Sequence, residues 1–282
     1  MGPIGLRAQQ TYHDTFCDQI VLEWKSPQFH GKNIVLVEGV RDKSLYSKFT
    51  TSDTEVRETH GCRELPDVLR GVRGLIPVQS IAIKDSDFSR VNDSFISFPG
   101  LFYTDSHDCE MMMLSCKDVF DTTVAEIGIK MEEETLVKVW DLLSPLSLLK
   151  WYCYSSSPQK RFSFKDVKIW AMSDEDALNL NHLINIAFAT TKACGRDVEL
   201  DYDEITEFVS SHSAYNNWEV VNGHDFIKVL SSRSKHNCSP KTFYNVLSRN
   251  YTLTHFMSTN LYKDIKQYES SISGERNYSF FI

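Results

Sequence analysis

The chain has 282 residues, of which 41% are hydrophobic and 24% charged, a composition typical of a globular protein with a sizeable core. Its 38 acidic and 30 basic side chains give a formal net charge of -8, which excludes a polycation that coats nucleic acid over its whole surface. Any nucleic-acid site is therefore expected to be local.

Two strand and helix units are predicted at the start of the chain. Residues 34–37 form a continuous run of β-branched and apolar side chains, which is typical of a strand buried on both faces. Residues 42–49 have helical spacing of their apolar side chains. A second strand is predicted at 54–61, and a second helix at 62–74.

The same alternation continues with strands predicted within 78–89 and at 101–104, and with a helix at 109–115. This order indicates a mostly parallel sheet with right-handed crossovers, and sites in such sheets gather at the carboxyl ends of the strands. The predicted strand ends carry Glu38, Asp42, Asp85, Asp87, Asp105, His107, Asp108 and Glu110.

Beyond about Lys117 the sequence changes to long amphipathic segments, with a short hairpin predicted at 161–172. The predicted helical segments are 132–153, 173–194, 201–213 and 239–268. We therefore predict an N-terminal extension at 1–30, an α/β core at 31–117 and a mainly helical region at 118–282 that packs on the core.

Cysteine usage and hydropathy indicate a reduced, cytoplasmic protein. The seven cysteines form no CxxC pair, and their odd number does not favour a disulfide framework. The start of the chain lacks the pattern of a secretion signal, and the most apolar stretch is interrupted by Pro145 and Lys150, so no membrane partner is expected.

The clustered carboxylates predict a site for a divalent cation. Acids gathered at one sheet edge repel one another, and a cation relieves that repulsion. Mg²⁺ and Mn²⁺ take carboxylate oxygens, waters and phosphate oxygens, so phosphoryl transfer is a plausible chemistry. Asp85 and Asp87 face one cation if the backbone between them stays extended. Taken alone, Asp-x-Asp is more often a solvated turn or a helix cap.

Four motifs in order resemble those of TOPRIM-like nucleases of anti-phage defence, both the OLD type and the nuclease subunits of PARIS systems. They are VEGxxDxxxY at Val37 to Tyr46, Asp-x-Asp-Phe at 85–88, YTDxHDxE at Tyr103 to Glu110, and the late Gly-His-Asp at 223–225. The resemblance covers residues 30 to 115 well and implies a TOPRIM-like, mostly parallel sheet with flanking helices.

By this resemblance Glu38 is a general acid/base or a metal ligand, and Asp85 and Asp87 hold Mg²⁺ or Mn²⁺. Asp42 and Glu110 complete the site, and His224 orients a phosphate or a water, although a histidine after glycine is more often a turn or capping residue. The chain departs from the pattern at positions 89–90, Ser and Arg, where many relatives continue with acids. That departure puts a second metal site in doubt.

The resemblance also implies a function and partners. The expected activity is cleavage of nucleic acid, with tRNA or another RNA as a serious candidate, and an ABC-type ATPase is expected to restrain the nuclease until infection. A homodimer is a further possibility that the sequence leaves open. The chain has no phosphate-binding loop of its own that would hydrolyse ATP.

A basic segment near the end of the chain is the predicted substrate face. The residues between Lys228 and Lys266 have a net charge of +6, and the predicted substrate-binding residues are Lys228, Arg233, Lys235 and Lys241. The aromatic residues that could stack on bases are Phe243, Tyr244, Tyr251 and Tyr262. The alternatives are a solvated helix face or a dock for an acidic partner in the case of the cations, and core positions in the case of the aromatics.

Two other classes of function stay open. A haloacid-dehalogenase-like phosphatase would use Asp85 as its nucleophile, but that family carries its Asp-x-Asp on the first strand. A non-catalytic adaptor with the TOPRIM fold would be expected to lose acidic residues, and the central ones are all present.

Overall fold

The computed structural model describes residues 16–59, 65–76, 79–129, 133–233, 238–272 and 279–282. Contacts divide the chain into two compact units. The first, here called the sheet unit, comprises residues 1–85, 96–105 and 252–282, and the second, the helical unit, comprises 86–95 and 106–251.

The sheet unit is built on four parallel strands in the order β2-β1-β3-β4. The strands are β1 (Asn33–Val37), β2 (Thr54–Glu58), β3 (Ser80–Lys84) and β4 (Leu101–Tyr103). All five residues of β1 and of β3 are buried, because helices cover both faces of the central strands. The chain is therefore an α/β protein with an all-parallel sheet, as predicted.

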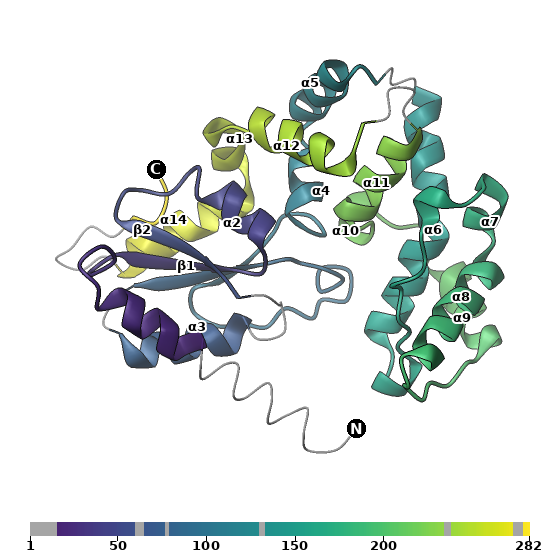
Figure 1. Ribbon diagram of the computed structural model, residues 1–282, viewed down its shortest axis with the longest axis horizontal. Helices are drawn as coiled ribbons and strands as arrows, with labels where there is room; N and C mark the ends of the chain where they lie inside the picture. Colours follow the sequence, from purple (N-terminus) through teal and green to yellow (C-terminus); the bar gives the residue numbers. More distant parts are fainter. Residues whose placement is uncertain (1–15, 60–64, 77–78, 130–132, 234–237, 273–278) are drawn as a thin grey trace. The chain divides into compact units, whose positions relative to one another are not determined.

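One face of the sheet packs against α3 (Leu65–Leu75) and the helical residues 16–24 (Figure 1). Alternation along β1 points Ile34 and Leu36 to this face, where they meet Leu69 and Val72 of α3 in one core cluster. Cys17 and Ile20 belong to the same cluster. The described part of the predicted N-terminal extension is thus part of the core.

The opposite face carries α2 (Val40–Tyr46) and α14 (Asn260–Ile272), with α13 (Leu253–Ser258) nearby in the same unit. Phe256 of α13 stacks on Phe49 with ring centroids 5.3 Å apart and lies 5.0 Å from the Phe281 ring. An antiparallel bridge joins Thr50 to Phe281. The end of the described chain is therefore built into the core of the sheet unit.

Helices dominate the second unit, as predicted. Its longest helix, α6 (Glu133–Ser155), continues through Pro145. The other helices are α4 (Cys109–Leu114), α5 (Lys117–Ile127), η1 (Pro158–Lys160), η2 (Ile169–Ala171), α7 (Asp174–Leu178), α8 (Leu180–Ala193), α9 (Tyr202–Ser211), α10 (Asn217–Val220), α11 (Gly223–Arg233) and α12 (Pro240–Asn250).

The loop that follows the Asp-x-Asp motif belongs to the helical unit because its side chains pack on α6. Phe88 is buried with Trp151, and their ring planes are nearly parallel with centroids 6.5 Å apart. The Trp151 indole N–H donates to Asn92 Oδ1 at 2.8 Å. The predicted boundary at 117/118 is therefore not where the units divide.

The end of the chain also departs from the predicted division, since 252–282 belongs to the sheet unit. Asp105, just after β4, accepts hydrogen bonds from the backbone N–H groups of Asn260 at 2.7 Å and Leu261 at 2.8 Å. These bonds satisfy two free donors at the start of α14 and fix that helix beside β4.

The predicted hairpin at 161–172 is wrong, because the described residues there form no strands. The Phe162 backbone N–H donates to Cys153 Sγ at 3.5 Å, and the Ser163 N–H donates to Thr191 Oγ1 at 2.7 Å. Side chains of α6 and α8 thus take the hydrogen bonds that a partner strand would have taken.

The predictions on cysteine pairing and on membrane-spanning segments can be compared with the described residues. The cysteines there, Cys17, Cys109, Cys116, Cys153, Cys194 and Cys238, are free thiols. No helix in the same ranges has both the length and the apolar content needed to cross a membrane.

Candidate functional site

The carboxyl ends of β1 and β3 form the topological switch point of the sheet. From β1 the chain runs through α2 to β2 on one side, whereas from β3 it continues to β4 on the other. Because the connections leave these two adjacent strands in opposite directions, neither connection covers the space between their carboxyl ends. In open α/β sheets, this is the position where ligands bind. Glu38 follows β1 directly, and Asp85 follows β3 directly.

Three charged side chains lie at the switch point: Glu38, Lys84 and Asp85. The strand register places Val37 beside Ile83, so Glu38 lies opposite Lys84. Lys84 Nζ is 3.4 Å from Glu38 Oε1, and the Asp85 backbone N–H donates to the same oxygen at 3.1 Å. Sequence reasoning missed Lys84, although a lysine at the end of the buried strand SIAIK is a signal in itself.

Asp42 lies at the start of α2 and caps it. Its Oδ2 accepts a hydrogen bond from the Gly39 backbone N–H at 2.9 Å, and the residue is buried. This contact explains the spacing between the two residues, because a carboxylate on the first turn reaches back to a free donor at the helix N-terminus. The predicted catalytic role of Asp42 stays a prediction beside this structural one.

Asp87 belongs to the helical unit and has a left-handed backbone, with φ of 44°. The condition for Asp85 and Asp87 to face one cation, an extended backbone through the Asp-x-Asp motif, is therefore not met at this residue. The Asp87 N–H donates to the His107 carbonyl at 2.8 Å, which holds the turn. Left-handed non-glycine residues store strain and gather at functional sites, and aspartate is one of the few that tolerate the conformation.

The YTDxHDxE block supplies a buried acidic pair at the start of α4. Asp108 caps this helix by accepting from the Met111 N–H at 2.8 Å, and it also accepts from the Gly223 N–H at 2.7 Å. Burial, and then the neighbouring Glu110 carboxylate, raise the pKa of Asp108 well above its ordinary value. Glu110 is itself buried and accepts from the Cys109 thiol at 3.1 Å.

His107 lies beside this pair and is buried as well. Its ring centroid is 4.9 Å from that of Phe88, and its Nδ1 is 3.2 Å from the Glu219 carbonyl oxygen. Burial lowers the pKa of His107, while the Asp87 carboxylate acts in the opposite direction. Four ionisable groups of the helical unit therefore interact within one small region.

The Gly-His-Asp motif begins α11 and joins it to α4. A Cβ on Gly223 would lie 2.5 Å from Asp108 Oδ1 and from Glu110 Cβ, so the close approach requires glycine. Asp225 forms an ion pair with Lys150 of α6. His224, on the first turn of α11, is half-buried, and its predicted role toward phosphate stays a prediction.

Several residues of the predicted nucleic-acid face lie in positions where they are not available to bind nucleic acid. Phe243, Tyr244 and Tyr251 are buried in the helical unit, so for these three residues the core alternative holds and base stacking does not. Lys266 belongs to the sheet unit, where it donates to the Phe281 carbonyl at 2.6 Å, so it is a structural residue.

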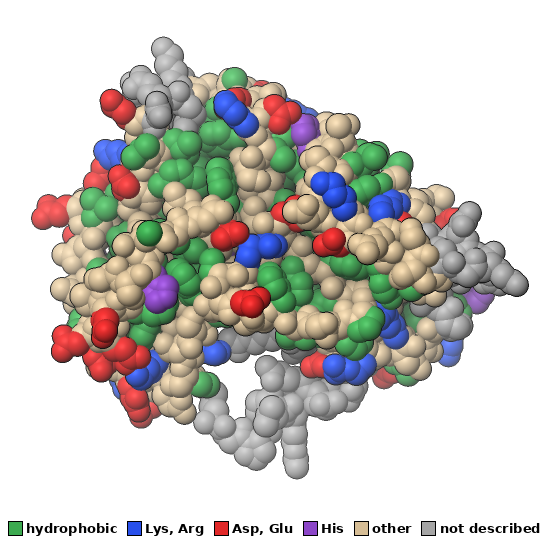
Figure 2. All heavy atoms as spheres, turned by 180° about the vertical axis from the view of Figure 1, so that it is seen from behind, with side chains coloured by type: hydrophobic (Ala, Val, Ile, Leu, Met, Phe, Trp, Pro, Cys, Tyr) green, Lys and Arg blue, Asp and Glu red, His purple; other side chains and the backbone are tan. Residues whose placement is uncertain are grey.

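The other cations of that segment that the structure describes lie in different surroundings. Lys228 lies over the Trp170 ring at 3.9 Å from its centroid, and Arg249 pairs with Glu126. Lys241 lies on the first turn of α12 and is exposed. Lys235 and the Arg233 side chain lie outside the described residues. On the face shown in Figure 2, Lys and Arg side chains are scattered rather than gathered.

Two carboxylates at the switch point fit the needs of Mg²⁺ or Mn²⁺. In the ranges that the structure describes, no group of three or more His, Cys, Asp and Glu side chains is placed to hold a metal ion alone. Mg²⁺, however, usually takes one or two carboxylates and completes its shell with waters and substrate phosphate oxygens. Glu38 and Asp85 match that donor set.

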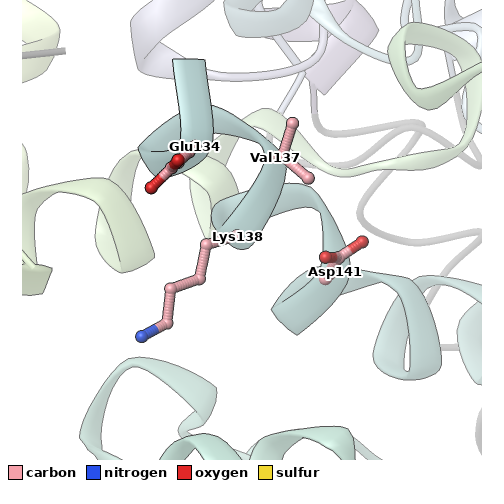
Figure 3. Close-up of a pocket in the computed structure, with 4 residues that line it drawn as sticks. All are labelled: Glu134, Val137, Lys138 and Asp141. Carbon is pink, nitrogen blue, oxygen red and sulfur yellow. The ribbon is translucent and has the colours of Figure 1, made fainter. Parts of the chain in front are cut away.

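A separate hollow of about 380 Å³ lies along α6 in the helical unit. Its described lining residues are Glu134, Val137, Lys138 and Asp141, all from this one helix (Figure 3). Lys138 also pairs with Asp174 at 2.7 Å. With two acids and one paired lysine, this lining offers little to a phosphate group, so the hollow is not a second candidate for the site.

Comparison with known proteins identifies no relative: no family model, curated protein or solved structure matches the chain.

The electrostatic coupling around Asp87 predicts a stabilising substitution. Asp87→Asn should raise the melting temperature in chelator at pH 8 by about 2–4 °C, because it removes one charge from the buried acidic group. A raised pKa of Asp108 costs stability above the ordinary pKa of aspartate and nothing below it. The gain should therefore disappear as the pH falls toward 4.

Asp93→Asn is the matched control for this prediction. Asp93 also has a left-handed backbone, with φ of 47°, but its side chain is exposed. Asparagine tolerates the left-handed backbone at both positions, and each substitution removes one negative charge, so the two tests differ only in the surroundings of that charge. Equal melting temperatures for Asp87→Asn and the wild type at pH 8 would show that Asp87 does not repel its neighbours.

Proposed function

We propose that the chain is a metal-dependent nuclease of the TOPRIM type that acts in anti-phage defence. The observation that supports this most is the placement of Glu38 and Asp85 at the carboxyl ends of the two switch-point strands. The all-parallel sheet and the four ordered motifs support the same reading.

The proposed reaction is hydrolysis of a phosphodiester. A water oxygen bonds to phosphorus, one phosphorus–oxygen ester bond breaks, the water loses a proton, and the leaving oxygen gains one. Glu38 is proposed to take the proton from water, and Asp85 to orient the bound cation. Mg²⁺ or Mn²⁺, held by these carboxylates, would supply an activated water and charge stabilisation at the phosphate. The predicted roles of Asp87 and Glu110, which belong to the helical unit, stay predictions and are not part of this proposal.

The proposed partner is an ABC-type ATPase that restrains the nuclease until infection. A nuclease active on host nucleic acid must be held inactive, and the motif resemblance points to this class of partner. The charge reversal Lys241→Glu separates two uses of the basic segment. A loss of substrate binding that is largest at low salt and shrinks as salt is added would indicate a nucleic-acid contact, whereas normal cleavage with loss of the ATPase in co-purification would indicate a dock.

Cleavage assays with the purified chain test the proposal. We expect single-stranded RNA, tRNA or DNA to be cut in Mg²⁺ or Mn²⁺ and to stay intact in chelator, with sequencing of the ends to identify the substrate. The assay should include the co-expressed ATPase and infected-cell extract, so that a restrained enzyme is also detected. Phosphate trapped covalently on Asp85 would support a phosphatase instead, and an absence of all cleavage under these conditions would support an adaptor.

A further inference from the structure

Lys84 is a buried lysine at the switch point, and its position follows from the sheet. Burial extends through all five residues of β3, and Lys84 is only 9% exposed. Alternation and register place its side chain on the same face as the neighbouring Glu38, 3.4 Å from Oε1. Its Nζ is also 3.4 Å from the Asp85 carbonyl oxygen.

Burying an ammonium group is costly, and breaking a buried ion pair leaves an uncompensated charge. Other lysines of the sheet unit meet their partners nearer to solvent. Lys43, for example, pairs with Glu58 at 2.6 Å with a third of its side chain exposed. Lys84 is instead buried at the sheet edge, next to Glu38 and Asp85, the two residues that are proposed to bind the cation.

The formal charges at this position favour a single divalent cation. Glu38, Asp85 and Lys84 together carry one net negative charge. One divalent cation leaves one net positive charge, which a phosphodiester then neutralises. A second divalent cation would leave an excess of two positive charges after the substrate had bound. In phosphodiesterases with two metals, the second cation supplies positive charge that Lys84 already supplies here.

Distance leads to the same conclusion. A cation bound to Glu38 Oε1 would lie at most about 5.5 Å from the Lys84 ammonium, given oxygen–metal distances near 2.1 Å. At that range in a partly buried site, the lysine charge weakens cation binding by at least about tenfold. The first cation is still attracted by the net negative charge, but a second meets net repulsion.

We propose that Lys84 takes the electrostatic part of a second metal ion, so that the switch-point carboxylates bind one divalent cation per chain. The inference rests on the proposed nuclease function and adds a residue and a stoichiometry to it. The Lys84 ammonium donates hydrogen bonds to a phosphate oxygen of the substrate and keeps its proton throughout, so the balance of the hydrolysis is unchanged.

The experiment is a titration of the full chain with Mn²⁺, in which electron paramagnetic resonance measures the concentration of free Mn²⁺. The proteins compared are the wild type, Lys84→Met, Lys84→Arg and the control Lys43→Met. We expect one Mn²⁺ per wild-type chain. Lys84→Met should bind that ion at least about tenfold more tightly, whereas Lys84→Arg should keep the wild-type stoichiometry and affinity within about threefold. Lys43→Met removes a lysine–glutamate pair elsewhere in the sheet unit and should leave Mn²⁺ binding unchanged.

Cleavage at saturating Mn²⁺ gives the second measurement. Lys84→Met should lose at least about 100-fold in rate despite its tighter metal binding, because the charge on the reacting phosphate is no longer balanced. Lys84→Arg should retain part of the rate. Lys43→Met should cleave as the wild type does. A merely structural role for Lys84 would lower the melting temperature without tightening Mn²⁺ binding.

The outcomes separate this inference from the proposed function. Two Mn²⁺ ions per wild-type chain, or unchanged Mn²⁺ affinity in folded Lys84→Met, overturn the role of Lys84 even if the wild type is an active nuclease. If Lys84→Met does not fold, the wild-type stoichiometry and the Lys84→Arg variant still decide the question. One Mn²⁺ per chain without any cleavage by the wild type overturns the nuclease and supports the single-cation site alone.

Discussion

Glu38→Gln should abolish metal-dependent cleavage, with a loss of at least about 10³-fold, and leave the protein folded. Glutamine keeps the length of the side chain and an oxygen that accepts from the Asp85 N–H, a bond of 3.1 Å in the wild type. It lacks the negative charge needed to bind a cation and the basicity needed to take a proton. The measurement is the single-turnover cleavage rate in Mg²⁺ and in Mn²⁺.

Glu58→Gln is the matched control for that experiment. Glu58 is the last residue of β2, so it is also a glutamate at the carboxyl end of a parallel strand. It lies on the edge strand beside Val37, whose side chain points to the opposite face of the sheet from that of Glu38, and it pairs with Lys43. Glu58→Gln should therefore cleave at the wild-type rate. Full activity of a folded Glu38→Gln would remove this glutamate from the reaction and with it the main support for the proposed function.

The central strands were predictable because a strand that is buried on both faces is apolar at almost every position. The buried run 33–37 and the buried run 80–84 contain only one charged residue between them, at the end of the second. A strand of that kind needs no knowledge of its neighbours to be recognised. The acids that follow could be assigned to a common sheet edge from the order of strands and helices alone.

The contacts that decide the site depend on register and on long-range packing, which local patterns do not contain. Lys84 became a candidate only when the pairing of β1 with β3 placed it opposite Glu38. Asp105 was grouped with the site acids, yet its oxygens cap α14, which begins about 155 residues later. The packing role of Gly223 could not be predicted from the sequence, because the residues that it contacts belong to α4, more than 100 positions earlier in the chain.

Gly223→Ala should cause the largest loss of stability among these substitutions, about 1–3 kcal/mol in the free energy of unfolding of the helical unit. The added methyl group would lie 2.5 Å from Asp108 Oδ1 and 3.0 Å from the Met111 backbone nitrogen, in a fully packed region. The Gly223 N–H also donates to Asp108, so a shift of α11 away from α4 would weaken that bond as well. Urea unfolding followed by circular dichroism measures the loss.

Gly74→Ala provides the comparison that isolates packing from helix propensity. Gly74 lies within α3, and a Cβ there would have no atom within 4 Å. Alanine should therefore stabilise the sheet unit by about 0.5–1 kcal/mol, since it restricts the unfolded chain and favours the helix. If Gly223→Ala were also neutral or stabilising, α11 and α4 would have to be farther apart than the structure places them. The Gly-His-Asp motif would then need an explanation other than close packing against the buried acids of α4.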